Sequence, residues 1–107
     1  ELIQSAANLL KKEIDNYDFK DFEFPLVSNV TASVCNANEI KNLLIDQVVC
    51  RVKWRECLRY IIDKDTTNFI EIGPGNILTN LVKRMGKKIN AVSISTIEDL
   101  EKLRKLI

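Results

Sequence analysis

The sequence has 107 residues, with 16 basic and 15 acidic side chains, and it contains no histidine. A Ser-His-Asp triad, a Cys-His pair or a histidine metal site therefore cannot be assembled from these residues alone. The net charge of +1 gives no general attraction to nucleic acid or to acidic membranes. No apolar run is long enough to span a membrane, and the 46% of hydrophobic residues indicates a globular chain.

The start of the chain and its cysteines add two expectations. The sequence begins with Glu1 rather than Met, which suggests that it was processed or that it starts inside something longer. Cys35, Cys50 and Cys57 form an odd set with no CxxC pair. They are typical of reduced cysteines in a cytosolic or matrix-like compartment. No metal site is expected, because no set of paired-cysteine or histidine ligands exists.

The first half of the chain alternates helical and extended signals. Apolar residues at helical spacing predict an amphipathic helix over residues 2–15, and the β-branched run at 25–30 predicts a strand. Asn36 followed three residues later by Glu39 is a capping box, which predicts that a helix begins there. A further helix is predicted for residues 51–64.

The second half has a regular strand–helix–strand pattern. Residues 67–72 and 91–95 are predicted strands, and an apolar stripe predicts a helix of about nine residues from position 77. The turn at 73–76, Gly-Pro-Gly-Asn, separates the first strand from this helix. Gly86 stands where a C-terminal cap glycine would stand.

A second capping box, Ser95 with Glu98, predicts a short charged C-terminal helix. Strands separated by helices imply parallel pairing with right-handed connections. The predicted fold class is therefore α/β, a mostly parallel sheet with helices on both faces. Three parallel strands leave two open edges, which indicates that they belong to a larger sheet.

Gln47 is a candidate site residue on the helix that follows Asn36. It lies seven residues after Ile40 and three after Leu44, on the apolar face of that helix. An amide directed at a core must find hydrogen-bond partners. Gln47 is therefore either a satisfied structural glutamine or a group that orients something in a site.

Two polar stretches follow predicted strands, where ligands bind in open α/β sheets. The turn at 73–76 opens a helix, whose N–H groups can bind an anion, but it fails as a dinucleotide motif because Leu78 stands at the third glycine position. Ser28 and Asn29 end the predicted strand at 25–30, and Ser28 has no base in this chain to activate it as a nucleophile. For both stretches an ordinary turn is the alternative.

Basic residues gather late in the chain, and such a cluster is either a solvated face or a docking surface for an acidic partner. Its members are Lys83, Arg84, Lys87, Lys88, Lys102, Arg104 and Lys105.

Three segments resemble one enzyme family, the malonyl-CoA:acyl-carrier-protein transacylases. Residues 25–31, PLVSNVT, resemble that family's PVVSNVT segment, and Gln47 followed by Val52-Lys53-Trp54 resembles its Q…PVRW segment. Residues 69–84, FIEIGPGNILTNLVKR, are similar to its FVEVGPGKVLTGLVKR segment. The order and spacing of the three also match, and the resemblance covers nearly the whole chain.

The resemblance implies that residues 1–107 are the C-terminal segment of an α/β-hydrolase-like large subdomain, without the ferredoxin-like insert and the nucleophile region. The family moves malonyl from coenzyme A to the phosphopantetheine thiol of acyl carrier protein in fatty-acid biosynthesis. The reaction passes through an acyl-serine with a histidine base and uses no cofactor. The resemblance puts the serine upstream, and the histidine just before Glu1. It also implies a cytoplasmic protein.

The resemblance also assigns roles to particular residues. Gln47 matches the glutamine whose backbone carbonyl orients the catalytic histidine. Asn29 is a weaker candidate for lining the substrate cleft, and Lys83, Arg84 and Lys87 are candidates for docking the carrier protein. Arg51 stands where the family has a proline, which puts the position of the Gln47 carbonyl in question.

The expected partners are acyl carrier protein, the coenzyme A thioester and the missing N-terminal part of the enzyme, with no nucleic acid and no membrane. Two alternatives stay open: an acyltransferase domain of a polyketide or fatty-acid synthase, and a non-catalytic α/β interaction module.

Overall fold

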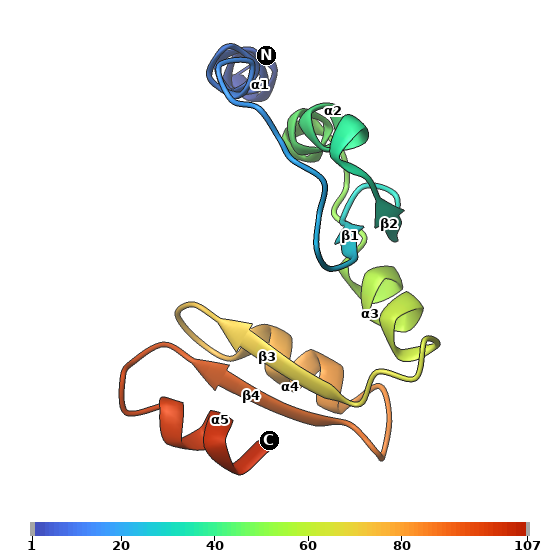
Figure 1. The fold of residues 1–107 in the computed structure, drawn as a ribbon, viewed down its shortest axis with the longest axis vertical. Helices are drawn as coiled ribbons and strands as arrows, with labels where there is room; N and C mark the ends of the chain where they lie inside the picture. Colours follow the sequence, from blue (N-terminus) through green and yellow to red (C-terminus); the bar gives the residue numbers. More distant parts are fainter. Residues whose placement is uncertain (1, 107) are drawn as a thin grey trace. The chain divides into compact units, whose positions relative to one another are not determined.

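The computed structural model describes residues 2–106, which divide into two compact units that meet in sequence between Tyr60 and Ile61 (Figure 1). The helices and strands, in chain order, are α1 (Leu2–Ile14), β1 (Leu26–Ser28), β2 (Ser33–Cys35), α2 (Ala37–Val49), α3 (Trp54–Ile62), β3 (Asn68–Ile72), α4 (Ile77–Lys83), β4 (Asn90–Ile94) and α5 (Leu100–Leu106). Among the described residues no helix combines the length and the apolar character needed to cross a membrane.

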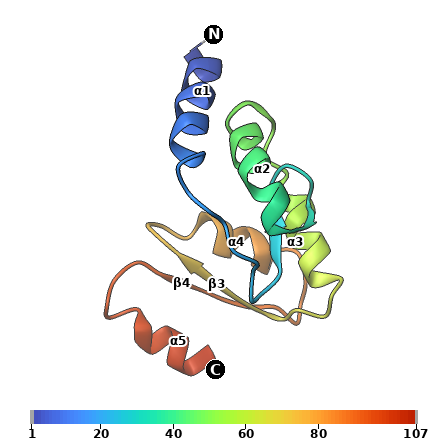
Figure 2. The ribbon, with the colours of Figure 1, turned by 45° about the horizontal axis from the view of Figure 1, so that its top comes forward.

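Unit 1 consists of a helix pair, a β-hairpin and the larger part of α3. α1 packs against α2, and the two helices lie side by side in Figure 2. Ala7 and Ile14 of α1 and Ile40 of α2 are buried. The amphipathic pattern predicted the existence of both helices, because tertiary packing of an apolar face is what stabilises helices of this length.

The predicted strand at 25–30 does not join a parallel sheet within the described residues. β1 instead pairs antiparallel with β2, with Leu26 opposite Cys35 and Ser28 opposite Ser33. The four-residue turn closes because the Ala32 N–H donates to the Ser28 carbonyl at 2.8 Å and Ala32 adopts a left-handed φ of 55°. The sequence did not predict this turn, because position 32 is an alanine and not the glycine or asparagine that is typical of a left-handed turn residue.

Unit 2 contains the parallel strand–helix–strand motif that the sequence predicted. β3 pairs parallel with β4, with Asn68 opposite Asn90 and Ile72 opposite Ile94. α4 forms the connection and contacts both strands, and α5 contacts β4. The described residues therefore form a helix-rich chain with two two-stranded sheets, of which one is parallel.

Two predicted helix boundaries are wrong. α3 begins at Trp54 rather than at residue 51, because residues 51–53 form an irregular connection. α4 ends at Lys83, and the N–H groups of Arg84 and Met85 close the last turn on the carbonyls of Leu81 and Val82, at 3.2 and 3.0 Å.

Gly86 and the second capping box also differ from the prediction. Gly86 has no left-handed φ, so it is not a cap glycine. A Cβ there would lie 3.0 Å from Ile89 Cδ1, so the residue is small because of a close approach. Ahead of α5 the capping carboxylate belongs to Asp99, not Glu98, since the Ser95 and Thr96 N–H groups donate to Asp99 Oδ2 at 3.0 and 3.1 Å.

Candidate functional site

The position of Gln47 follows from how α2 begins and ends. At its start the Asn36 side-chain oxygen accepts the N–H groups of Asn38 and Glu39 at 3.0 and 3.1 Å, so the predicted N-cap is confirmed. At its end the Cys50 N–H donates to the Asp46 carbonyl at 2.8 Å. Gln47 therefore lies in the last turn, where carbonyls lack an N–H partner inside the helix.

The backbone carbonyl and the side chain of Gln47 have different surroundings. No backbone N–H of residues 2–106 donates to the carbonyl. The side chain is half-buried and lines a hollow of about 400 Å³ between α1 and α2, together with Leu10, Ile14, Leu44 and Val48. The prediction that Gln47 shares the apolar face of its helix is confirmed, because its side chain lies beside Leu44 and Val48 in this hollow.

Asn29 is fixed by the first turn of α3. Its backbone carbonyl accepts the Lys53 N–H at 2.8 Å, and its side-chain Oδ1 lies 3.6 Å from the thiol of Cys57. The same thiol lies 3.3 Å from the carbonyl of Ser28. One turn of helix, from Lys53 to Cys57, thus holds the peptide that leaves β1, a contact that no sequence pattern indicated.

The chain provides no activated nucleophile in this region. Ser28 is only 6% exposed, and its Oγ accepts the N–H of Val30 at 3.1 Å. Burial raises the pKa of the Cys57 thiol, and burial likewise raises the pKa of the Cys35 thiol. Protonated, buried thiols are inert. Among residues 2–106 no group of acidic and cysteine side chains is arranged to hold a metal ion.

The structure links Asn29 and Gln47 only through the backbone. Lys53, which holds the Asn29 carbonyl, comes six residues after Gln47. Asn29 does not line the hollow beside Gln47, and no hydrogen bond joins the two in the described part of the chain. Arg51, which lies between Gln47 and Lys53 in the sequence, stands where the resemblance led us to expect a proline. Its guanidinium forms an ion pair with Glu56 at 3.0 Å.

The helix start that follows the turn at 73–76 is capped by a carboxylate of the chain itself. Glu71 of β3 accepts the N–H and hydroxyl of Thr79, at 2.8 and 2.6 Å, and lies 3.4 Å from the N–H of Leu78. The Thr79 hydroxyl, with these N–H groups, lowers the pKa of Glu71. Gly73 and Gly75 adopt positive φ values of 138° and 86°, which turn the chain back for this contact. Sequence reasoning missed Glu71; a strand-end carboxylate just before a Gly-Pro-Gly turn was the available signal.

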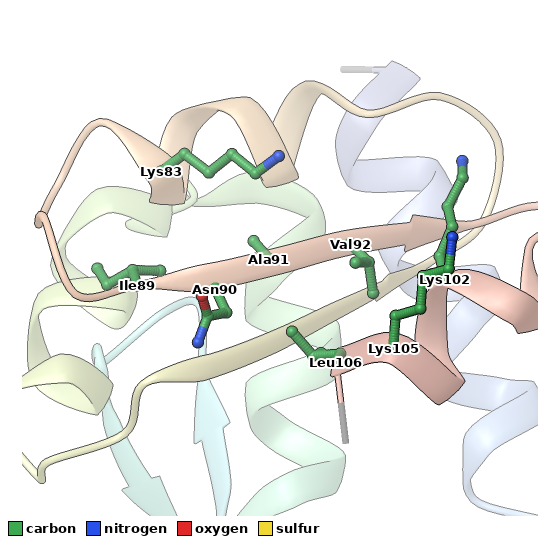
Figure 3. A pocket seen from close by; sticks show the side chains of 8 residues that line it. All are labelled: Lys83, Ile89, Asn90, Ala91, Val92, Lys102, Lys105 and Leu106. Atoms are coloured by element: carbon green, nitrogen blue, oxygen red, sulfur yellow. The ribbon is translucent and has the colours of Figure 1, made fainter.

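The structure divides the predicted basic cluster. Lys83, Arg84 and Lys87 are exposed, but only Lys83 lines a hollow of about 420 Å³ on unit 2 (Figure 3). Lys102 and Lys105 of α5 lie on its other side, and the hollow is also lined by Ala91 and Val92 of β4 and by Ile89 just before that strand. Lys102 is already paired with Asp99 at 2.9 Å.

Comparison with known proteins gives consistent matches. No protein-family model matches the chain. The chain is 38% identical over 102 residues to a malonyl CoA-acyl carrier protein transacylase of Bacillus subtilis (strain 168), covering 94% of this chain and 32% of that protein. It superposes on MCAT from Streptococcus pneumoniae with a TM-score of 0.87 and 30% identity, over 97% of this chain and 34% of that one.

A third match is a malonyl-transacylase, PlMCAT, solved in complex with the type II PKS acyl-carrier protein AntF. It has a TM-score of 0.82 and 29% identity, over 94% of this chain and 33% of that one. All three proteins transfer acyl groups, so the fold of this chain is that of an acyltransferase segment. More narrowly, the chain is homologous to part of the malonyl CoA-acyl carrier protein transacylases, and it spans about a third of the length of these relatives.

Proposed function

We propose that this chain is the C-terminal part of a malonyl-CoA:acyl-carrier-protein transacylase that serves fatty-acid biosynthesis. The observation that carries the proposal is the 38% identity over 102 residues to the Bacillus subtilis transacylase. The complete enzyme transfers malonyl from coenzyme A to the phosphopantetheine thiol of acyl carrier protein through an acyl-serine, without a cofactor. The serine nucleophile and the histidine base come from the rest of the enzyme, since this chain contains no histidine.

The proposal extends to the fold and the location. β3 and β4 form part of a larger, mostly parallel sheet of the α/β-hydrolase-like large subdomain, with helices on both faces. The apolar side chains of Ile70 and Ile72, 46% and 85% exposed, support this extension, because strands inside parallel sheets are apolar on both faces. The enzyme is cytoplasmic, in keeping with the free cysteines Cys35, Cys50 and Cys57.

Gln47 is the residue of this chain that contacts the catalytic histidine. Its free backbone carbonyl accepts the Nδ1–H of the catalytic histidine, in the place that an aspartate takes in a Ser-His-Asp triad. Such an acceptor fixes the tautomer of the imidazole and stabilises the imidazolium that forms when it takes the serine proton. The open last turn of α2, in which Cys50 donates to Asp46 and not to Gln47, supports the assignment.

Substrate and carrier contacts complete the proposal. Asn29 lines the cleft that binds the coenzyme A thioester, since it directly follows the carboxyl end of β1 and is half-exposed. Lys83, Arg84 and Lys87 present an exposed basic surface to the acidic carrier protein.

Malonyl transfer to holo acyl carrier protein, measured for the complete enzyme and for the 107-residue chain alone, tests the function. Transfer by the complete enzyme and none by the chain alone is expected, because the nucleophile and the base lie outside it. Turnover by the chain alone contradicts the assignment of roles. A complete protein that has no serine and histidine at the corresponding positions would instead be the non-catalytic module.

The type II PKS complex of PlMCAT favours a second candidate, malonyl transfer to a carrier protein of polyketide synthesis. The same assay with carriers of both pathways separates the two, since the larger kcat/KM identifies the natural carrier.

A further inference from the structure

The Ser28–Asn29 peptide is held from one side by two residues a helical turn apart. The Lys53 N–H donates to the Asn29 carbonyl at 2.8 Å, and the Cys57 thiol lies 3.3 Å from the Ser28 carbonyl and 3.6 Å from Asn29 Oδ1. The Cys57 N–H in turn donates to the Lys53 carbonyl at 2.9 Å. The carboxyl end of β1 and the first turn of α3 are therefore one connected hydrogen-bonded structure.

The thiol of Cys57 is suited to act as a donor. It is 3% exposed, and burial raises its pKa, so the sulfur keeps its proton at neutral pH. Both neighbouring atoms, the Ser28 carbonyl oxygen and Asn29 Oδ1, are acceptors without a proton. The Ser28 carbonyl already receives the Ala32 N–H at 2.8 Å, whereas within residues 2–106 the thiol is the one donor near Asn29 Oδ1.

We propose that Cys57 is a positioning residue for Asn29, whose amide N–H groups it directs at an oxygen of the acyl-thioester substrate. Because Oδ1 and Nδ2 share one planar group, holding Oδ1 against α3 turns Nδ2 away from it. Nδ2 carries two donors, and neither has a partner among residues 2–106. The inference rests on the proposed transacylase function and adds a residue that does not itself touch the substrate.

A pair of substitutions separates hydrogen bonding from packing. Cys57→Ser and Cys57→Ala both remove the sulfur and leave side chains of similar size, but only serine keeps a donor. In the complete enzyme we expect Cys57→Ser to keep KM for malonyl-CoA within about twofold of the wild type. Cys57→Ala should raise it about fivefold with kcat nearly unchanged, since the lost contact is equally strong in the ground state and the transition state.

A double-mutant cycle shows whether Cys57 acts through Asn29. Asn29→Ala should raise KM at least as much as Cys57→Ala, and the double variant should raise it no further, because coupled residues are not additive. Equal KM values for Cys57→Ser and Cys57→Ala, or KM effects that multiply in the double variant, would overturn the inference.

A second readout is independent of the reaction. In crystal structures of the complete protein, the Asn29 side chain should keep its conformer in Cys57→Ser and leave it in Cys57→Ala. The same conformer in both variants overturns the positioning role. Absence of malonyl transfer by the wild-type enzyme instead refutes the proposed function, and the conformer comparison then decides the role of Cys57 by itself.

Discussion

The starts of the helices in unit 2 and the end of α2 in unit 1 differ in how their backbone groups are satisfied. In unit 2 the carboxylate of Glu71 accepts the first N–H groups of α4, and that of Asp99 accepts those of Ser95 and Thr96 ahead of α5. In unit 1 the carbonyl of Gln47, in the last turn of α2, accepts no N–H from residues 2–106. The helix that follows the Gly-Pro-Gly turn is therefore capped by the chain's own Glu71, whereas the proposed acceptor for the catalytic histidine lies at a helix end that no local motif marks.

The largest expected effect tests the open end of α2. Gln47→Pro in the complete enzyme should lower kcat/KM for malonyl transfer about a hundredfold, because proline inside a helix costs about 3 kcal/mol and displaces the carbonyl. Gln47→Ala keeps the backbone carbonyl and should lower it less than about threefold. Steady-state kinetics measure both, with Asp46→Ala as the neighbouring control. Equal activity of the Pro and Ala variants would refute the carbonyl role.

A smaller effect is expected from the basic surface of unit 2. Reversing the charges of Lys83, Arg84 and Lys87 to Glu should raise KM for the carrier protein about tenfold at low salt and less at high salt, because ions screen the attraction. KM for malonyl-CoA should not change. Reversal of Lys11 and Lys12, which are exposed on α1, is the control. If KM for the carrier protein does not change, these three residues form an ordinary solvated surface and not a docking site.

The cap of α4 should affect stability rather than activity. Hydrogen bonds from Thr79 and Leu78 lower the pKa of Glu71, so its contribution is complete above the ordinary carboxyl pKa and is lost as the pH falls through the lower folded value. Glu71→Gln should therefore lower Tm by several degrees at pH 7 and hardly at all in strong acid. Thermal unfolding across this range measures the difference.

Glu98→Gln is the control for Glu71→Gln, because it removes the same charge from an exposed residue that does not cap a helix. A Tm difference between the wild type and Glu71→Gln that stays constant down to strong acid would show that the Glu71 charge is not what stabilises the turn.

The smallest expected effect concerns the hairpin of unit 1. Ala32 holds a left-handed φ of 55°, which costs an alanine about 1 kcal/mol relative to a favourable conformation. Glycine adopts this conformation freely, although it also loses more entropy on folding. Ala32→Gly should therefore change the unfolding free energy by less than about 1 kcal/mol, and denaturant unfolding measures it. A loss of several kcal/mol would contradict the left-handed turn.

The sequence by itself determined the elements whose signals are local. The apolar spacing of α1 and α2, the Asn36 cap and the β3–α4–β4 order follow from periodicity and capping chemistry, and the resemblance of three segments determined the family. These signals span only a few residues, so they can be recognised in the sequence without knowledge of the tertiary structure.

Only the tertiary structure decided which polar groups contact one another and which have no hydrogen-bond partner among residues 2–106. The hairpin partner of β1, the Glu71 cap and the thiol of Cys57 against Asn29 each join residues from five to 28 positions apart in the sequence. No local pattern encodes such contacts, because they depend on where separate elements come to lie. The resemblance made the Gln47 carbonyl a candidate. Only the structure shows that no backbone N–H of residues 2–106 donates to it, because that depends on where the neighbouring N–H groups lie.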